Sequence, residues 1–317
     1  MPQLRQTKLP KTELISKQPA EERQDQEEAP QLIRITALAV SHNRVDLLRK
    51  AIEALEKSEE REKLEILVVD NGSTDGSAQL EADFPNARFI RMPRNFGLTK
   101  AINVGVRSAT GEFIMLLHED TEVSADTARV LANILESRSE VGAACPLLVT
   151  AGGEPAPQIA ELPEPGHTAV VWRPADPAIG EQQVEYARGA AIMLRSFFLR
   201  AMRQIDERYG TYGSDAELCY QVQRAGKRVL VVPATRAVDH GRPDPDARSR
   251  AMREADFKLG MALYLRKRYG LVRGLLFRVS SVMGAFGGLL TMRALPYRLT
   301  LFGWLWNGQK IDGTQAQ

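Results

Sequence analysis

The sequence predicts an α/β protein with a mostly parallel, Rossmann-like central sheet flanked by helices, followed by a C-terminal helical region. The apolar run at residues 64–69 ends abruptly in a polar, glycine-rich stretch at residues 70–77, and the run at residues 113–117 ends in the same way at residues 118–120. Buried parallel strands have this pattern, because both their faces are covered and their ligands bind beyond their carboxyl ends. The alternation of such runs with amphipathic segments is typical of parallel strands joined by helices.

Length and composition bound the domain organisation. The 317 residues suffice for one large α/β domain with an appendage, or for two domains. Residues 1–30 are rich in Gln, Glu, Lys and Pro and contain no aromatic residue, so we expect a disordered leader. The first residues hold no apolar stretch of the signal-peptide type. We expect the α/β domain at residues 31–245 and a basic helical region at residues 246–317.

The two cysteines, Cys145 and Cys219, lie far apart in the sequence and outside any metal-ligand spacing. We expect each to be a small buried hydrophobic residue rather than a redox or zinc-binding group. This use of cysteine suits a reducing cytosol.

The first half of the domain is expected to alternate strands with helices. The apolar runs predict strands at residues 33–40, 65–69, 87–91 and 113–117. The segments between and after them predict helices at residues 45–58, 78–83, 98–108 and 124–137. In the first helix, Leu48, Ile52 and Leu55 recur on one face with helical spacing. Ser124 is a suitable N-cap for the last of these helices.

The second half of the domain begins with an irregular segment. Residues 150–180 are rich in Pro, Gly and Ala, which predicts a long loop of the kind that often serves as a functional lid. Ordered structure is expected to resume at residues 185–194. Helices at residues 196–202 and 214–225 and a strand at residues 228–232 then lead to His240.

The acidic strand ends, at Asp70 and at Glu119 and Asp120, suggest a nucleotide and a metal ion held side by side. Carboxylates would repel an anionic diphosphate unless a divalent cation, coordinated from both sides, stood between them. Such a cation would also stabilise the charge that develops on a leaving diphosphate. The neutral imidazole of His240 could add a further ligand. On spacing alone, Glu119 and Asp120 could equally form a solvated turn that caps a helix, and His240 could be a surface residue.

Seven blocks in order, between residues 33 and 241, resemble the inverting family 2 glycosyltransferases with a GT-A fold. The likeness is in particular to the rhamnosyltransferase-like members that build bacterial cell-surface polysaccharides. A single block would be weak support, whereas seven in the family's order are specific. The blocks are residues 40–44, 68–77, 94–97 with 103–105, 116–122, 188–195, 206–219 and 240–241.

The resemblance implies a donor site and a metal site. Asp70 would accept a hydrogen bond from the nucleotide base, and Ser41 and Asn43 would line the same pocket. Asp120 and His240 would bind Mg²⁺ or Mn²⁺ beside the diphosphate. The other residues that the resemblance places on the donor are Arg44, Gly72, Ser73, Arg94, Gly97, Lys100, His118 and Glu119. Among these, Gly97 could serve only a tight turn, and Arg94 and Lys100 could be solvated cations.

The resemblance also places Asp215 on the family's general base. An inverting transfer needs one in-line attack by an acceptor hydroxyl, which is a poor nucleophile until a positioned base takes its proton. The alternative is that Asp215 only caps the helix that follows, a role that Ser214 could fill instead. Ser214 stands where the family usually has Glu, and His118 with Glu119 makes an unusual acidic motif.

We therefore expect an active inverting enzyme for hexosyl or deoxyhexosyl transfer. Its donor would be a dTDP- or UDP-sugar, and its acceptor a glycan or a polyprenyl-linked sugar. The alternative is a catalytically weakened sugar-nucleotide-binding or scaffold protein of the same fold at the membrane. A nucleotidyltransferase would carry glycine-rich phosphate signatures that this chain lacks. A dinucleotide-binding dehydrogenase is excluded because no predicted strand leads into G-x-G-x-x-G.

The C-terminal region has one sign of charge and helical apolar spacing. Residues 257–310 contain no Asp or Glu and nine Lys or Arg residues, which indicates an anionic partner. The uncharged stretch at residues 279–292 is shorter than the ~20 residues of a spanning helix. With flanking arginines and with Trp304 and Trp306, it predicts a helix in the membrane interface, and so a cytoplasmic protein peripheral on the inner face of the membrane. Packing on the domain or on a second copy is the alternative. Nucleic acid is not expected, because the tail lacks interleaved aromatic residues.

Overall fold

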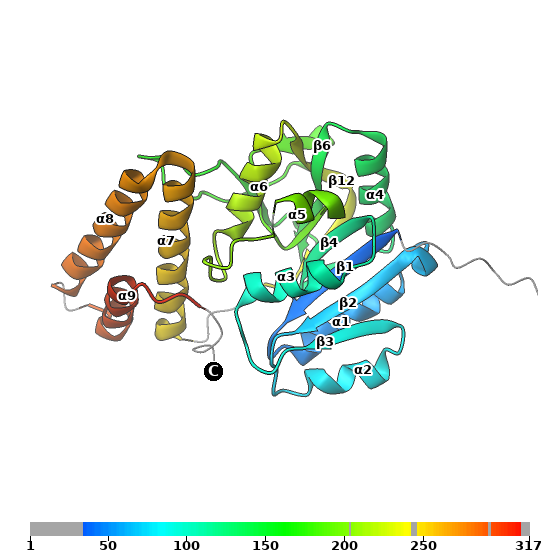
Figure 1. Ribbon diagram of the computed structural model, residues 1–317, viewed down its shortest axis with the longest axis horizontal. Coiled ribbons are helices and arrows are strands. Elements are labelled where there is room, and N and C mark those ends of the chain that lie inside the picture. Colours follow the sequence, from blue (N-terminus) through cyan, green and yellow to red (C-terminus); the bar gives the residue numbers. More distant parts are fainter. Residues whose placement is uncertain (1–33, 203, 242–245, 291–292, 312–317) are drawn as a thin grey trace, which may run out of the picture. The chain divides into compact units, whose positions relative to one another are not determined.

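The computed structural model describes residues 34–202, 204–241, 246–290 and 293–311 (Figure 1). The predicted leader at residues 1–30 and the predicted domain boundary at residue 245 lie outside the described residues. The first predicted strand also began at residue 33, just outside them. Within the described residues, the chain forms a nine-stranded central sheet, a three-stranded sheet and a C-terminal group of helices.

The first four strands of the central sheet are parallel, as the sequence predicts. They lie side by side in the order β3-β2-β1-β4 (Figure 1). Their bounds are β1 Ile35–Ser41, β2 Leu64–Asp70, β3 Ala87–Arg91 and β4 Phe113–His118. Along β1, Ala37 and Ala39 belong to one apolar core and Leu38 and Val40 to the other, so both faces of the sheet are covered. This double burial explains the continuous apolar runs in the sequence.

The other half of the sheet is mixed. Strand β11 (Ala191–Arg195) runs antiparallel to β4 and to β6 (Val141–Thr150), while β12 (Arg228–Asp239) is parallel to β6. Strands β5 (Thr121–Val123) and β9 (Gln182–Val184) add antiparallel pairs to β12. The sequence analysis assigned no element to the ten residues of β6, although nine of them are buried.

Strand β12 continues past its predicted end. The prediction stopped at Val232 because Pro233 follows, yet the strand runs on to Asp239. Its register against β6 shifts between Val232 and Arg236. The irregularity removes the need for a ladder hydrogen bond at Pro233, which is how a proline is tolerated inside a sheet.

Helices cover the two faces of the sheet. Residues of α1, α2 and α4 join the core on one face, and residues of α3, α5 and α6 join the core on the other. Cys145 and Cys219 are buried and free in the second core, as expected of small hydrophobic residues. The bounds are α1 Val45–Glu56, α2 Leu80–Asp83, α3 Leu98–Ser108, α4 Thr127–Ser137, α5 Ser196–Ala201 and α6 Ser214–Arg224.

The predicted cap of α4 is wrong. The helix begins at Thr127 with Asp126 at the N-cap position, not at Ser124. The backbone N–H of Ser124 instead donates to the carbonyl of Arg236, 2.9 Å away, because Ser124 directly follows strand β5. The pairing of β5 with β12 therefore delays the start of the helix.

The segment at residues 150–180 is more ordered than the predicted irregular loop. It contains β7 (Pro157–Ala160), β8 (Arg173–Pro174) and a 3₁₀ turn, η3 (Pro177–Ile179). Strand β7 lies between β8 and β10 (Tyr186–Ala187) in the three-stranded sheet. The fully buried side chain of Gln158 anchors it, since it donates to the carbonyl of Pro146 at 2.6 Å and accepts from the amide of Leu148 at 3.0 Å.

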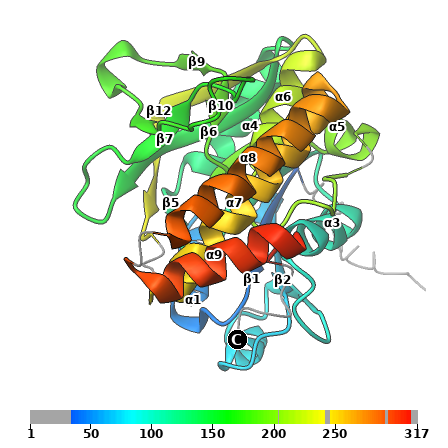
Figure 2. The same ribbon diagram turned by 90° about the vertical axis from the view of Figure 1, so that its left-hand side faces the viewer.

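Three helices form the C-terminal region: α7 (Ala247–Tyr269), α8 (Leu271–Leu289) and α9 (Leu295–Asn307). They pack against one another, and Figure 2 shows α8 and α9 in front of α7. Gly274 of α8 lies directly on Ala262 and Arg266 of α7, where a Cβ would clash. Helix α8 ends before the predicted residue 292, and residues 291–292 lie outside the described part. No helix in the described ranges combines the length and apolarity that a bilayer crossing requires.

Candidate functional site

The carboxyl ends of three neighbouring strands bring the first predicted residues together. In the sheet, Ser41 at the end of β1 pairs with Asp70 at the end of β2, and Val40 pairs with His118 at the end of β4. The backbone N–H of His240 donates to the carbonyl oxygen of Asp120 at 2.9 Å. Residues from four of the seven sequence blocks therefore meet at one edge of the sheet.

Ser41 and Asp70 are neighbouring polar residues at this edge. Both are buried, with 1% and 3% of their surface exposed. Asp70 accepts a hydrogen bond from the amide of Ser73 at 3.0 Å. Within the described residues, the Ser41 hydroxyl and Nδ1 of His42 have no hydrogen-bond partner. Since an unpaired buried polar atom is costly, these two atoms are the kind of group that a bound polar ligand would satisfy.

Hydrogen bonds join the turn that follows β1 to the turn that follows β2, next to Ser41 and Asp70. The Asn43 amide donates to Ser73 Oγ at 3.0 Å, and Asn43 Oδ1 accepts from the amide of Thr74 at 2.7 Å. Gly72 has φ of +77°, and a Cβ there would clash with the backbone of Arg94. The structure thus brings Asn43, Gly72, Ser73 and Arg94 into one assembly, and only glycine fits at position 72.

Asp75 and Asn71 hold these turns and were not singled out as site residues. Asp75 accepts from the amides of Val45 at 2.8 Å and Ser77 at 3.1 Å. Burial would raise the pKa of Asp75, but the hydrogen bonds from Ser77 and Val45 outweigh burial and lower it. Asn71 Oδ1 accepts from the amide of Phe96 at 2.9 Å. Both residues lie inside the matched block at residues 68–77, and this position could have marked them as site residues.

Two of the cations predicted on the donor, Arg94 and Lys100, lie over the ring of Phe96. The guanidinium of Arg94 and the ammonium of Lys100 each lie 4.6 Å from the centre of the Phe96 ring. Gly97, with φ of +89°, occupies the N-cap position of α3, and Arg44 occupies that of α1. None of these four residues lines the pocket described next.

A pocket of about 510 Å³ lies at the same end of the sheet. Three predicted site residues line it, namely His118, Asp120 and Asp215. They come from sequence positions almost a hundred residues apart. Other lining residues that matter below are Tyr186, Arg188, Thr211, Tyr212, Ser214 and Asp239.

Asp215 is fixed in the first turn of α6. Its Oδ1 accepts from the hydroxyl of Tyr186 at 2.7 Å and from the amide of Ala216 at 2.9 Å. Burial, and then the negative charge of Asp215, raise the pKa of Tyr186 well above its ordinary value, so this tyrosine stays a donor. Gly189 packs against Asp215, where an added Cβ would lie 3.2 Å from that of Asp215.

Sequence reasoning missed Tyr186 because it lies just before a matched block. Its place beside Asp215 comes from the antiparallel pairing of β10 with β7, in which Tyr186 pairs with Ala160. No local pattern signals that pairing. The tyrosine is fully buried and stacks on Trp172 at 4.7 Å between ring centres.

With Arg253, Arg188 is one of two guanidinium groups that line the pocket. Burial lowers its pKa, while the negative charges of Asp120 and Asp215 oppose that shift, and an arginine stays protonated in either case. Its guanidinium forms an ion pair with Asp239. Arg188 belongs to a matched block, but the sequence analysis gave it no role. The pocket lining therefore combines two guanidiniums, of Arg188 and Arg253, with four carboxylates, of Asp120, Asp215, Asp239 and Glu254.

The two predicted metal ligands, Asp120 and His240, are joined by a backbone hydrogen bond, but the described residues form no closed metal cage. Asp120 and Asp239 line the pocket and offer the hard oxygen ligands that Mg²⁺ and Mn²⁺ prefer. The imidazole Nε2 of His240 lies 3.1 Å from a carboxylate oxygen of Glu122. Among the described residues, no three His, Cys, Asp or Glu side chains converge on a point. Glu119 is buried, with 4% of its surface exposed. The residues fit a divalent ion whose shell is completed by phosphate oxygens and water.

Similar proteins were found by sequence. The chain is 27% identical over 247 residues to the O-antigen biosynthesis protein RfbC of Myxococcus xanthus, a match that covers 73% of this chain and 19% of RfbC. It is 22% identical over 235 residues to an N-acetylglucosaminyl-diphospho-decaprenol L-rhamnosyltransferase of Mycobacterium tuberculosis, which covers 65% of this chain and 76% of the relative. The chain thus spans only about a fifth of RfbC but most of the rhamnosyltransferase.

Solved structures share the fold. GalNAc-T7, solved with UDP, GalNAc and Mn²⁺, superposes with a TM-score of 0.57 at 17% identity over 78% of this chain and 55% of that chain. Residues 1–349 of Staphylococcus aureus TarS superpose with a TM-score of 0.53 at 14% identity over 87% of this chain and 92% of that chain. These likenesses show the GT-A fold that the sequence blocks imply.

The family model described as glycosyl transferase family 2 matches residues 36–200, which is more than half of the chain. The matched range contains Ser41 and Asp70, the acidic residues that follow β4, and residues 186–188. On this match, together with the GT-A fold, the chain belongs to glycosyltransferase family 2.

Proposed function

We propose that the protein is an inverting glycosyltransferase. It moves a hexosyl or deoxyhexosyl group from a dTDP- or UDP-sugar to a hydroxyl of a glycan or a polyprenyl-linked sugar. The observation that carries the proposal is the pocket in which Asp215, fixed by Tyr186, shares a wall with Arg188 and Asp120. The relative named as acting on N-acetylglucosaminyl-diphospho-decaprenol supports a lipid-linked acceptor.

In this mechanism Asp215 is the general base. The acceptor oxygen attacks the anomeric carbon, its proton passes to Asp215, and the bond from that carbon to the diphosphate breaks on the opposite face. Both hydrogen bonds of Asp215 described above go to Oδ1, so Oδ2 is the oxygen that receives the proton. Tyr186 holds the carboxylate in place and excludes water from that side.

The leaving diphosphate needs positive charge. Arg188 supplies a permanent one within the pocket, where it already faces carboxylates. Asp120 and Asp239 would hold a divalent ion, with His240 as the further predicted ligand, and a bound metal would stabilise the negative charge on the departing phosphate oxygens. Ser41 and Asp70 would receive the base, since Ser41 brings an unpaired buried hydroxyl.

The nucleotide and the metal can be tested by thermal shift. UDP, dTDP, GDP and ADP would each be added with and without Mn²⁺ or Mg²⁺. We expect stabilisation by UDP or dTDP only when metal is present, because the diphosphate and the carboxylates repel each other without it. The shift should disappear in Asp120→Ala and persist in the control Asp126→Ala, which changes the N-cap residue of α4 instead.

A second candidate is a donor-binding protein with weakened catalysis. The observation that favours it is Ser214, which stands where the family usually has Glu and which is 6% exposed at the pocket wall. A metal-dependent nucleotide shift without any transfer to a panel of glycan and polyprenyl acceptors would favour this candidate. The absence of any nucleotide shift in the wild type would count against both.

A further inference from the structure

The segment Ile205–Ser214 leads directly to Asp215 and is held first by helix α3. The side-chain Nδ2 of Asn103 donates to the carbonyl of Ile205 at 2.8 Å, and Oδ1 of the same side chain accepts from the backbone N–H of Ile205 at 2.9 Å. Thr99 Oγ1 donates to the carbonyl of Tyr209 at 3.1 Å. All three contacts are long-range, so the segment takes its position from α3 and not from local sequence.

The opposite side of the segment is held by a buried carboxylate of α7. Asp256 is 0% exposed. Its Oδ2 accepts from the amides of Thr211 at 2.9 Å and Tyr212 at 3.1 Å, and its Oδ1 accepts from the amide of Ile311 at 2.8 Å. One carboxylate therefore joins the pocket wall, helix α7 and the segment that follows α9.

Two glycines let α7 come this close. A Cβ at Gly210 would clash with the Asp256 carboxylate, and a Cβ at Gly260 would clash with the carbonyl oxygen of Tyr212. Gly213, with φ of +90°, lies against Gly260. The α7 backbone is thus in direct contact with the two residues that precede Ser214.

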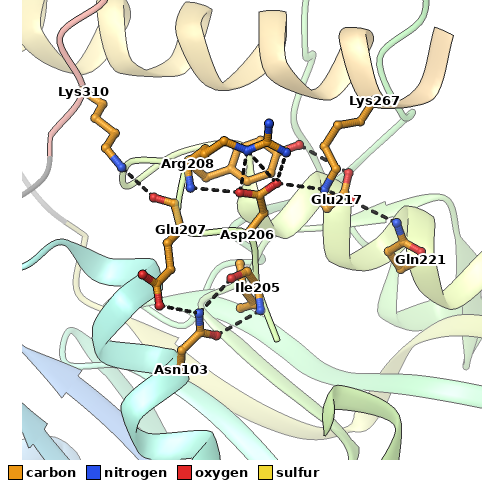
Figure 3. Close-up of polar contacts among 10 residues, drawn as sticks. Asn103, Ile205, Asp206, Glu207, Arg208, Glu217, Gln221, Lys267 and Lys310 are labelled. Carbon is orange, nitrogen blue, oxygen red and sulfur yellow. Dashed lines mark hydrogen bonds and ion pairs between the residues drawn. The ribbon is translucent and has the colours of Figure 1, made fainter. Parts of the chain in front are cut away.

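Lysines of α7 and of the segment after α9 add polar contacts to the start of the segment and to α6 (Figure 3). Lys267 of α7 bonds to Glu217 of α6 at 2.6 Å and lies 3.3 Å from Asp206. Glu217 is buried and also accepts a hydrogen bond from the hydroxyl of Tyr209 at 3.3 Å. Lys310, which follows α9, donates to the carbonyl of Glu207 at 2.5 Å.

We propose that Asp256, Lys267, Lys310 and Ile311 form a clamp. The clamp positions the Ile205–Ser214 segment, and with it Asp215, for the transfer reaction. Asp256 and Lys267 are positioning residues, since they act on Asp215 through the backbone of the segment and through α6. Thr211, Tyr212 and Ser214 line the same pocket as Asp215, so a shift of the segment moves the base relative to the acceptor. Small displacements of this kind are costly in rate. The C-terminal helices therefore help to position the general base. This inference rests on the proposed function.

Hydrogen–deuterium exchange tests the physical part without any substrate. Ile311→Pro removes the one amide that the tail gives to Asp256, whereas Ile311→Ala shortens the side chain and keeps the amide. We expect the Thr211 and Tyr212 amides to exchange at least tenfold faster in Ile311→Pro than in the wild type, and to be unchanged in Ile311→Ala. Asp256→Asn should also speed the exchange of the Thr211 and Tyr212 amides. Asp246→Asn, which changes the N-cap residue of the same helix, should leave their exchange unchanged.

Kinetics test the functional part. In Ile311→Pro and Asp256→Asn we expect kcat for transfer to fall at least tenfold, with the KM for the donor and the nucleotide thermal shift unchanged. Unaltered exchange at Thr211 and Tyr212 in Ile311→Pro, with the chain folded, would overturn the clamp. Accelerated exchange with an unchanged kcat would overturn its positioning role. Loss of transfer in the wild type itself would instead refute the proposed function, while the exchange result would still decide whether the clamp exists.

Discussion

At the scale of single residues, Tyr186 and Arg188 are the partners of the carboxylates in the pocket: one donates a hydrogen bond and the other brings a positive charge. Asp215 receives a hydrogen bond of 2.7 Å from a buried phenol, and Arg188 offsets the charges of Asp120 and Asp215. Four carboxylates line the pocket, and the guanidiniums of Arg188 and Arg253 offset part of their mutual repulsion. The proposed transfer depends on this positive charge, because the leaving diphosphate would be an anion.

Replacing Tyr186 by Phe should slow transfer without unfolding the protein. The substitution removes one hydrogen bond to the Asp215 carboxylate and keeps the ring that stacks on Trp172. We expect kcat to fall about tenfold, which corresponds to about 1.4 kcal/mol, with little change in the KM for the donor.

The matched control for this prediction is Tyr220→Phe, because Tyr220 is a tyrosine of α6, the helix of Asp215, and makes ring contacts with Tyr264 and Arg268. A rate in Tyr186→Phe equal to that of the control would remove Tyr186 from the mechanism. Loss of nucleotide binding in Tyr186→Phe would instead place it on the donor.

At the scale of elements, helix α8 shows a face that the described structure leaves in solvent. Val272, Leu276, Val279, Met283 and Phe286 are each about half or more exposed and recur with helical spacing. The opposite face packs on α7 through Gly274. With no acidic residue at positions 257–310, the exposed stripe has the composition of a helix that lies on an anionic membrane. We propose the membrane surface as its partner.

Charging this stripe should release the protein from anionic vesicles. Leu276→Glu with Met283→Glu removes apolar surface from the stripe and adds negative charge, so binding to phosphatidylglycerol vesicles should weaken by at least about tenfold in a co-sedimentation assay. The control pair Val171→Glu with Phe197→Glu alters two residues that are equally exposed but lie outside the helix. A stripe that covers a second copy would show dissociation of a dimer on gel filtration, with unchanged vesicle binding.

At the scale of the whole molecule, helix α7 connects the C-terminal helices to the catalytic half through Asp256. Burial raises the pKa of this carboxyl from 3.8 to about 6, against the hydrogen bonds from Ile311, Tyr212 and Thr211 and the charge of Lys310, which lower it. A carboxyl that holds its proton more tightly when folded gives stability that is complete below the unfolded pKa. That stability is lost as the pH rises through the folded value.

This linkage predicts that the free energy of unfolding depends on pH more strongly in the wild type than in Asp256→Asn. Between pH 5 and pH 7.5 the free energy of unfolding should fall by about 1 kcal/mol more in the wild type than in Asp256→Asn. Urea denaturation at the two pH values measures it. Asp246→Asn should follow the wild type, because the hydrogen bond from Ser249 lowers the pKa of Asp246 and keeps it ionised at both pH values. An equal fall in wild type and Asp256→Asn would contradict the raised pKa.

The sequence by itself determined the parallel half of the sheet and the edge at which the site lies. Strands β1, β2 and β4 are continuous apolar runs, because both their faces are buried, and each ends where polar residues begin. Local chemistry therefore marks both the strand and its carboxyl end. The family blocks added Asp215, which the structure places in the same pocket as Asp120.

Only the tertiary structure decided which distant segments complete the site. The mixed half of the sheet depends on β11 entering antiparallel between β4 and β6, a choice that no local pattern encodes. That pairing, with β10 on β7, brings Tyr186 and Arg188 to Asp215. In the same way, Asp256 contacts Thr211 from 45 residues away and Ile311 from 55. Hydrogen bonds between groups so far apart depend on how the elements pack, and packing is a property of the whole chain rather than of any window of sequence.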